Sequence, residues 1–272
     1  MAREQLFHDH RLPGIEARRS VDNRHSFKPH IHQGLSVGAV ESGQLLVTLG
    51  PEQLRLVPGE LVVINPGILH ACNPLDCPAR SFSILYLGLD LCLTLQQALW
   101  QTESFLPLRP PRLTDPRLFA SYLHTLASLF ATDRDLLEKE EAVAQLLATL
   151  FHSGVSAAPA PPPPSLSAEE TARLKERLSI NLEEELSLAE LARQRDTNPF
   201  TLLRRFKEAT GITPHAFRLN RRIDRAKELL QSGMEIADVA LQCGFYDQSH
   251  LHRHFKALTA MTPRQYQINF IQ

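Results

Sequence analysis

The chain has 272 residues, 43% of them hydrophobic, and a formal net charge of −1 at pH 7. This length predicts one or two domains with enough apolar content to bury a core. No stretch approaches the ~20 apolar residues of a membrane span, no early segment resembles a signal peptide, and the four cysteines lack paired metal-ligand spacing. We therefore expect a cytoplasmic protein with reduced thiols and no membrane partner.

The charge is unevenly distributed along the chain. Residues 1–168 hold 13 Lys and Arg against 16 Asp and Glu, whereas residues 193–272 hold 13 against 7, a net charge of +6. Excess positive charge in the C-terminal part is what binding to nucleic-acid phosphates requires.

The first part of the chain changes from a polar segment to short strands. Residues 1–25 are polar, and we interpret them as a flexible arm that ties down onto the domain or as a disordered tail. Apolar runs at residues 35–40 and 44–49 flank the turn Glu41-Ser42-Gly43, which predicts a hairpin. Short strands separated by Gly and Pro favour a small antiparallel β-barrel or jelly roll. Further strands are predicted at residues 54–57, 61–64 and 81–87.

Helical patterns and a proline-rich run follow the strands. Helices are predicted at residues 90–105, 116–132 and 136–152, with apolar faces that pack on the barrel or form a helix–helix contact in a homodimer. Ala158-Pro159-Ala160 followed by four prolines predicts an extended linker. We therefore divide the chain into a first domain at residues 1–152, a linker at 153–165 and a second domain at 166–272.

The second domain contains the same pattern twice. Residues 188–192 and 202–207 correspond to residues 236–240 and 251–256, with offsets of 48 before the turn and 49 after it. Each copy predicts a short amphipathic helix, a turn and a second helix with a basic outer face, which is the helix-turn-helix layout. Capping signals start helices at residues 168, 188 and 199, and a long helix from Pro214 joins the two copies. The residues of the pattern are Ala189, Leu191, Ala192, Arg204, Phe206, Lys207, Gly211 and Pro214, then Ile236, Val239, Ala240, Gly244, Phe245, Ser249, Leu251, Arg253, Phe255, Lys256 and Pro263.

This duplicated pattern resembles the DNA-binding region of AraC/XylS-type transcriptional regulators. The resemblance implies an all-α domain with two helix-turn-helix units, double-stranded DNA as partner, a homodimer and contact with RNA polymerase. Exposed residues near the start of each second helix reach base edges; arginine can read guanine, and an apolar side chain can contact a thymine methyl. The candidates for base contacts are Phe200, Thr201, Leu203, Arg204, Gln248, Ser249, His250 and Arg253. The candidates for phosphate contacts are Arg205, Lys207, Arg221, Arg222 and Lys256, for each of which a solvated charge is the alternative.

The strand region carries a second resemblance. Pro29-His30-Ile31-His32 and residues 58–70, which end at His70, resemble the cupin-like sensor domain that precedes the DNA-binding half in many AraC-type regulators. The resemblance implies a small-molecule effector inside the barrel and no cofactor. Cupin metal sites add a glutamate to such histidines, but that region holds Ser36 and Val37 here, so we predict no bound metal. The expected effector pocket is lined by His30, His32, Val37, Ile64, His70 and Tyr86.

The sequence thus predicts a multidomain α+β regulator, with a cupin-like β-barrel and helical appendage followed by an all-α double helix-turn-helix domain. No nucleophile elbow, phosphate loop or paired acidic motif indicates an enzyme. Two alternatives stay open. One is a constitutive DNA-binding regulator whose barrel only dimerises. The other is a metal-dependent cupin enzyme at His30, His32 and His70, which would leave the duplicated basic helices without a role.

Overall fold

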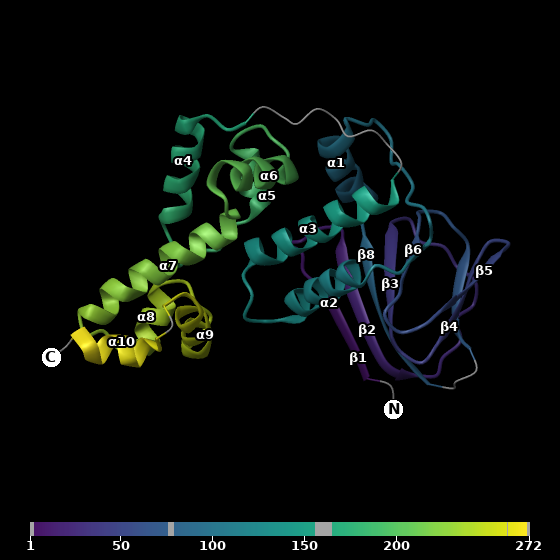
Figure 1. The fold of residues 1–272 in the computed structure, drawn as a ribbon, viewed down its shortest axis with the longest axis horizontal. Coiled ribbons are helices and arrows are strands. Elements are labelled where there is room, and N and C mark those ends of the chain that lie inside the picture. Colours follow the sequence, from purple (N-terminus) through teal and green to yellow (C-terminus); the bar gives the residue numbers. More distant parts are fainter. Residues whose placement is uncertain (1–2, 76–78, 156–164, 260, 271–272) are drawn as a thin grey trace. The chain divides into compact units, whose positions relative to one another are not determined.

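The computed structural model describes residues 3–75, 79–155, 165–259 and 261–270, which belong to two compact units (Figure 1). The first unit comprises Met1–Ala131 and Ala142–Pro161, and the second comprises Thr132–Glu141 and Pro162–Gln272. Most of the expected linker, residues 156–164, lies outside the described residues. The domain limits at residues 152 and 166 therefore stay a prediction.

The first unit contains two antiparallel sheets. The larger has the strand order β1-β2-β8-β3-β6-β9, and the smaller has the order β5-β4-β7. Together they confirm the antiparallel β fold expected for this part of the chain. The strands are β1 (Arg3–His8), β2 (Ile15–Asn23), β3 (Leu35–Ser42), β4 (Leu45–Leu49), β5 (Glu52–Leu56), β6 (Leu61–Ile64), β7 (His70–Pro74), β8 (Arg80–Leu87) and β9 (Arg112–Leu113).

The expectation that residues 1–25 are flexible or disordered was wrong, whereas their attachment to the domain is confirmed. They form β1 and β2, which pair with each other, and β2 also pairs with β8 at the centre of the larger sheet. Ile15 and Ala17 are 4% and 2% exposed, so the apolar side chains of β2 alternate with polar ones as in a half-buried strand. The neighbouring polar residues concealed this period in the sequence.

The predicted hairpin at residues 35–49 was also wrong. β3 pairs with β6 and β8 in the larger sheet, whereas β4 pairs with β5 and β7 in the smaller one. Glu41-Ser42-Gly43 therefore carries the chain from one sheet to the other. The hairpin of this region lies one step later, between β4 and β5, where the chain turns at Gly50 with φ of +55°.

Three helices follow the strands and bury apolar faces. They are α1 (Leu89–Trp100), α2 (Pro116–Phe130) and α3 (Leu136–Gly154). α1 ends five residues before the predicted limit because Gln101 adopts the left-handed conformation with φ of +54°. Tyr122 of α2 is fully buried, and its hydroxyl donates to the backbone oxygen of Val37 in β3 at 3.0 Å. α2 is thus attached to the outer side of the larger sheet.

The described part of the second unit is helical. Ser167 and Glu170 form both hydrogen bonds of the predicted capping box, and Ser187 and Asn198 cap two later helices as expected. Thr213, which was not predicted as a cap, caps the helix that starts at Pro214. No residue range was predicted for α10. The helices are α4 (Ala168–Ser179), α5 (Leu188–Arg193), α6 (Pro199–Thr210), α7 (Pro214–Gln231), α8 (Ile236–Gln242), α9 (Gln248–Thr259) and α10 (Pro263–Phe270).

The two helix-turn-helix units lie at opposite ends of α7. α5 and α6 form the first, and α8 and α9 the second (Figure 1). Apolar residues of α7, α8 and α9 form one core, which includes Ile223, Val239 and Phe255. These buried contacts set the positions from which α6 and α9 present their outer faces.

Candidate functional site

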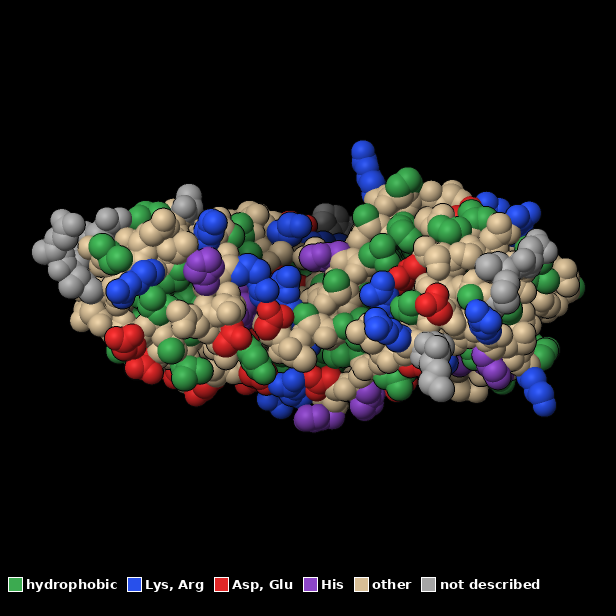
Figure 2. Space-filling view, turned by 90° about the horizontal axis from the view of Figure 1, so that it is seen from below, with side chains coloured by type: hydrophobic (Ala, Val, Ile, Leu, Met, Phe, Trp, Pro, Cys, Tyr) green, Lys and Arg blue, Asp and Glu red, His purple; other side chains and the backbone are tan. Residues whose placement is uncertain are grey.

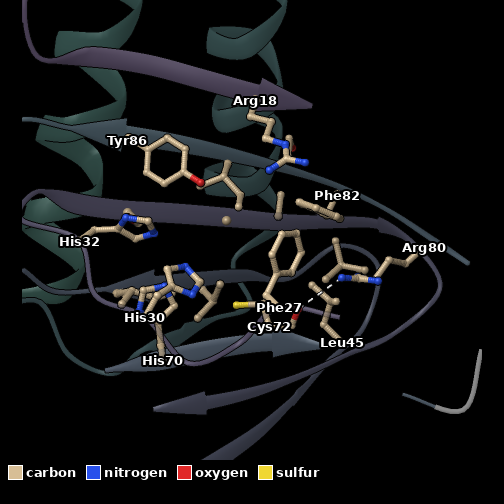
Figure 3. A pocket seen from close by; sticks show the side chains of 18 residues that line it. Arg18, Phe27, His30, His32, Leu45, His70, Cys72, Arg80, Phe82 and Tyr86 are labelled. Atoms are coloured by element: carbon tan, nitrogen blue, oxygen red, sulfur yellow. Dashed lines mark hydrogen bonds between the residues drawn. The ribbon is translucent and has the colours of Figure 1, made fainter. Parts of the chain in front are cut away.

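A partly open cavity of about 330 Å³ lies between strands of both sheets in the first unit. Most of its wall is apolar and is formed by side chains such as Val40, Leu45 and Val62. His30, His32 and His70 lie at one end of the cavity and Arg80 at the other, while Arg18 and Tyr86 lie along a third side (Figure 3). Ser36 and Ser83 also belong to the lining. A concave, mostly apolar volume with few polar groups is typical of small-molecule sites.

Five of the six residues predicted for the pocket line this cavity: His30, His32, Ile64, His70 and Tyr86. Val37 does not. Side chains alternate along β3, so Ser36, Gly38 and Val40 face the cavity while Val37 is buried on the other face of the sheet. The assignment of Val37 to the pocket is therefore corrected to its neighbour Ser36.

The three histidines lie close together. Their ring centres are 4.4 Å apart for His30 and His70, 4.8 Å for His30 and His32, and 5.0 Å for His32 and His70. His30 Nδ1 donates to the backbone oxygen of Lys28 at 2.8 Å, and His70 Nδ1 donates to that of Ile68 at 2.9 Å. A carbonyl oxygen only accepts, so Nδ1 carries the proton in the neutral form of each ring, and Nε2 is then the atom with a lone pair.

The electrostatics favour the uncharged forms of His32 and His70. Burial lowers the pKa of His32 and of His70, and the neighbouring imidazoles lower both values further. One potential ligand atom from each histidine lies within 4.8 Å of the others, a spacing that can hold a transition-metal ion. Glu41, the nearest later glutamate, is instead paired with Arg19 at 2.6 Å. The three rings therefore offer imidazole ligands without the carboxylate of the cupin pattern, and the absence of a metal stays a prediction.

The sequence reasoning missed the other end of the cavity. Phe27, Arg80 and Phe82 lie there, and Tyr86 shares their sheet face (Figure 3). The period of β8 is the signal that could have located this end of the cavity. Side chains alternate along a strand, so Ile84, Phe82 and Arg80 lie on the same face as Tyr86.

The second helices of the two helix-turn-helix units expose part of the predicted base-reading set. Gln248, Ser249 and Arg253 of α9 are exposed, and the Arg204 side chain of α6 is 33% exposed. Phe200 and Thr201 are half-buried at the start of α6. Arg253 donates to Asp133, which belongs to the same compact unit, at 2.5 Å.

Two members of the base-reading set face the core instead. Leu203 is 7% exposed and lies on the buried side of α6 with Leu202 and Phe206. His250 is 6% exposed, and its Nδ1 accepts a hydrogen bond from the backbone nitrogen of Tyr246 at 3.1 Å. Their positions are a correction to the sequence interpretation, because a buried side chain cannot reach a base edge without unfolding its helix.

The predicted phosphate set divides in the same way. Lys207, Arg221 and Lys256 are exposed, and Arg205 is half-buried. Arg222 is 4% exposed; it donates to the backbone oxygen of Leu182 at 3.0 Å and to Asp135 at 2.7 Å. The side chain of Arg222 thus holds the α4–α5 loop, which corrects its assignment to DNA phosphate. On the face drawn in Figure 2, Lys and Arg side chains are interspersed with Asp and Glu side chains.

Comparison with known proteins identifies the family. Residues 12–153, more than half of the chain, match the family described as the AraC-like ligand binding domain, and residues 191–268 match a helix-turn-helix domain family. The chain belongs to the AraC family of transcriptional regulators. It is accordingly a DNA-binding regulator with a ligand-binding N-terminal domain, and not an enzyme.

Individual relatives of this AraC-type chain agree with the family. It is 29% identical over 241 residues to the uncharacterized HTH-type transcriptional regulator YbfI of Bacillus subtilis, covering 87% of this chain and 86% of that protein. It is 35% identical over 88 residues to the probable transcriptional regulator LumQ of Photobacterium leiognathi, covering 32% of this chain and 36% of that protein.

Solved structures similar to this chain include two bacterial regulators. Apo ToxT from Vibrio cholerae is 13% identical with a TM-score of 0.37, over 98% of this chain and 97% of that one. An AraC-type regulator from Chromobacterium violaceum is 28% identical with a TM-score of 0.36, over 38% and 92%. TM-scores of this size do not support an assignment, so membership of the AraC family rests on the two family matches. In the part of the chain that the structure describes, no helix has the length and apolarity to cross a bilayer.

Proposed function

We propose that this AraC-type regulator binds a small-molecule effector in the cavity of its first unit and reads double-stranded DNA through α6 and α9. The observation that carries the proposal is the cavity of about 330 Å³. It lies between strands of both sheets, its wall is mostly apolar, and three histidines offer hydrogen-bonding atoms inside it. Such a site is suited to one small organic molecule.

Exposure supports a narrower set of DNA contacts than the sequence alone. Arg204, Gln248, Ser249 and Arg253 are our candidates for base edges, with the half-buried Phe200 and Thr201 beside them. An exposed ion pair contributes only about 0–1 kcal/mol, so DNA can replace Asp133 as the partner of Arg253. The candidates for phosphate contacts are Arg205, Lys207, Arg221 and Lys256.

The effector acts on DNA binding by shifting the balance between two states of the protein. It can do so only if it binds those states with different affinities. We further propose that the regulator works in the cytoplasm as a homodimer that places its helix-turn-helix units in successive major grooves, with RNA polymerase as a second partner. The alternative is a constitutive regulator whose first unit serves only to dimerise.

Selection of genomic DNA fragments by the full chain, followed by affinity measurements on the enriched site, tests the DNA contacts. Arg204→Ala and Arg253→Ala should each weaken binding by about 1–3 kcal/mol and relax specificity at one position. Arg173→Ala is the control, because Arg173 is an exposed arginine of the same unit on α4, outside both recognition helices. Sequence-independent binding by the full chain, or an equal loss in the control, would refute the assignment.

A second experiment distinguishes a sensor from a constitutive regulator. It measures the affinity for the enriched site with and without a metabolite that raises the unfolding temperature of the chain. A sensor should change its affinity or its preferred half-site spacing when the cavity is filled. Identical affinity and identical spacing with the metabolite bound would favour the constitutive alternative.

A further inference from the structure

Arg80, the first residue of β8, places a buried cation in the cavity. Its side chain is 1% exposed and points into the cavity toward Phe27 (Figure 3). The guanidinium carbon lies 5.8 Å from the centre of the Phe27 ring and 5.2 Å from that of Phe82. Burial lowers the pKa of Arg80, but a guanidinium remains protonated in proteins. The fold therefore holds a positive charge out of water beside two aromatic rings.

The described residues provide no opposite charge for Arg80. Its terminal nitrogens donate to the backbone oxygens of His25 at 2.7 Å, Cys72 at 3.3 Å and Asn23 at 3.4 Å, and its Nε has no partner. These acceptors are neutral. Arg18 also lines the cavity, but it is already paired with Glu4 at 2.8 Å. Within the described residues, Arg80 is thus a cavity arginine without an acid.

An uncompensated buried charge is unfavourable, and an anion that enters the cavity removes this penalty. The planar guanidinium presents its N–H groups in a fork that matches a carboxylate, and hydrogen bonds between two charged groups are about twice as strong as neutral ones. The Nε–H of Arg80, which has no partner among the described residues, is a donor from which such a group can accept.

The rest of the cavity limits the ligand further. Its wall near Arg80 is made of apolar side chains, among them Val40, Leu45 and Phe82. At the opposite end His32 and His70 are neutral, because their pKa values are lowered, and they favour an uncharged hydroxyl or carbonyl over a second carboxylate. The volume of about 330 Å³ is at the lower end of the ~300–1,000 Å³ range for small-molecule sites.

We propose that the effector is a small monocarboxylate: its carboxylate binds Arg80, its apolar body packs between Phe27, Phe82 and the strands, and an uncharged polar group reaches the histidines. This rests on the proposed function, because it names the chemical class of the molecule that the cavity senses.

The test is thermal unfolding and calorimetric titration of the full chain with matched probes. The carboxylate probes are octanoate, phenylpropanoate and hydroxyphenylpropanoate, and each is compared with its primary amide, which has the same shape without the charge. Glucose and phenylethylamine represent neutral polar and cationic ligands. At least one carboxylate should raise the unfolding temperature, and its amide should bind about tenfold or more weakly.

Variants assign the discrimination to Arg80. In Arg80→Met the carboxylate and its amide should bind equally weakly, whereas Arg80→Lys should retain part of the preference because it keeps the charge and loses the fork. The readout is the ratio of the carboxylate affinity to the amide affinity within one variant, because a general loss of stability lowers both affinities together. If Arg80→Met does not fold, Arg80→Lys provides the comparison. Arg19→Met is the matched control, because Arg19 lies on β2 next to Arg18, is paired with Glu41 and does not line the cavity. Asp76 lies outside the described residues, and Asp76→Asn tests whether this acid contributes to ligand discrimination. This variant should leave the preference for the carboxylate over its amide unchanged.

The possible results are distinct. Equal binding of carboxylates and amides to the unaltered chain, or a preference that survives in Arg80→Met or disappears in Asp76→Asn, would overturn the inference. Stabilisation by glucose or phenylethylamine and by no carboxylate would overturn it while leaving the proposed sensor intact. If no probe stabilises the chain and metabolite extracts leave DNA affinity unchanged, the sensor function itself fails.

Discussion

The imidazoles of the cavity couple the stability of the first unit to pH. Burial is the main reason why the pKa of His32 and that of His70 lie below the ordinary value of about 6.5. The folded unit therefore binds fewer protons than the unfolded chain between that value and the lowered ones. The two neutral histidines therefore contribute to the free energy of unfolding above about pH 6.5, and this contribution is lost as the pH falls through their pKa values in the folded unit.

Replacing His70 should therefore reduce the acid sensitivity of the protein. We expect the drop in unfolding temperature between about pH 7.5 and about pH 5.5 to be smaller in His70→Asn than in the unaltered chain. It should not vanish, because burial also lowers the pKa of His250, and that of His254 to about 4, in the second unit. His124→Asn, at an exposed position of α2, is the control and should behave as the unaltered chain. An undiminished drop in His70→Asn would contradict this account.

Buried arginines also change how the charge of the second unit should be interpreted. Arg218 of α7 is 2% exposed, and it donates to four backbone oxygens between Leu178 and Glu184 at 2.7–3.3 Å. Burial lowers its pKa to about 10. Arg222, one turn later, holds the oxygen of Leu182. These two arginines count toward the charge of +6 but satisfy carbonyl groups of the α4–α5 loop, so fewer cations are available to DNA.

At the scale of elements, the turn between α8 and α9 requires glycine for a tertiary reason. Gly244 has φ of +76°, and a Cβ added there would overlap the Leu182 oxygen and approach Arg222 Nε within 3.0 Å. The turn of the second helix-turn-helix unit therefore touches the loop held by Arg222. Gly211, at the end of α6, has φ of +80° with no atom within 4 Å of such a Cβ.

The two glycines form a matched pair for substitution. Gly211→Ala should lose about 1–2 kcal/mol of unfolding free energy, the cost of the left-handed conformation alone. Gly244→Ala should lose clearly more, because the added methyl group also displaces the Arg222–Leu182 hydrogen bond. Denaturant unfolding of the full chain measures both values. Equal losses would show that the contact at Gly244 adds nothing to the backbone effect.

At the scale of the whole molecule, the number of copies on DNA can be obtained from salt dependence. Each neutralised phosphate adds about 0.9 to the slope of log affinity against log salt concentration. Lys256 is exposed on α9, so Lys256→Ala should weaken binding to all DNA sequences by a similar factor. It should reduce the slope by ~1 if one copy of the protein contacts the site and by ~2 if a homodimer does. Titrations of both chains on the enriched site decide this, with Arg173→Ala as control. An unchanged slope would remove Lys256 from the phosphate contacts.

The sequence by itself determined the helix-turn-helix duplication and most helix limits. Its signals there are local: the cap residues Ser167, Ser187 and Asn198 lie within three residues of the groups they bind, and helical periodicity repeats within a turn. Short strands separated by Gly and Pro were also sufficient to predict that the first unit contains an antiparallel β fold. The resemblance to cupin-like domains identified His30, His32 and His70 as one group.

Tertiary structure decided which strands pair and which side chains are buried. The pairing of β2 with β8, the separation of β3 and β4 into two sheets and the burial of Leu203, Arg222 and His250 depend on contacts between distant segments. Arg80 illustrates the reason: it donates to the backbone of His25, 55 residues earlier in the chain. No local pattern encodes such a contact, because its free energy depends on the assembled core, and that core is where the cavity arises, with an arginine that has no acidic partner among the described residues.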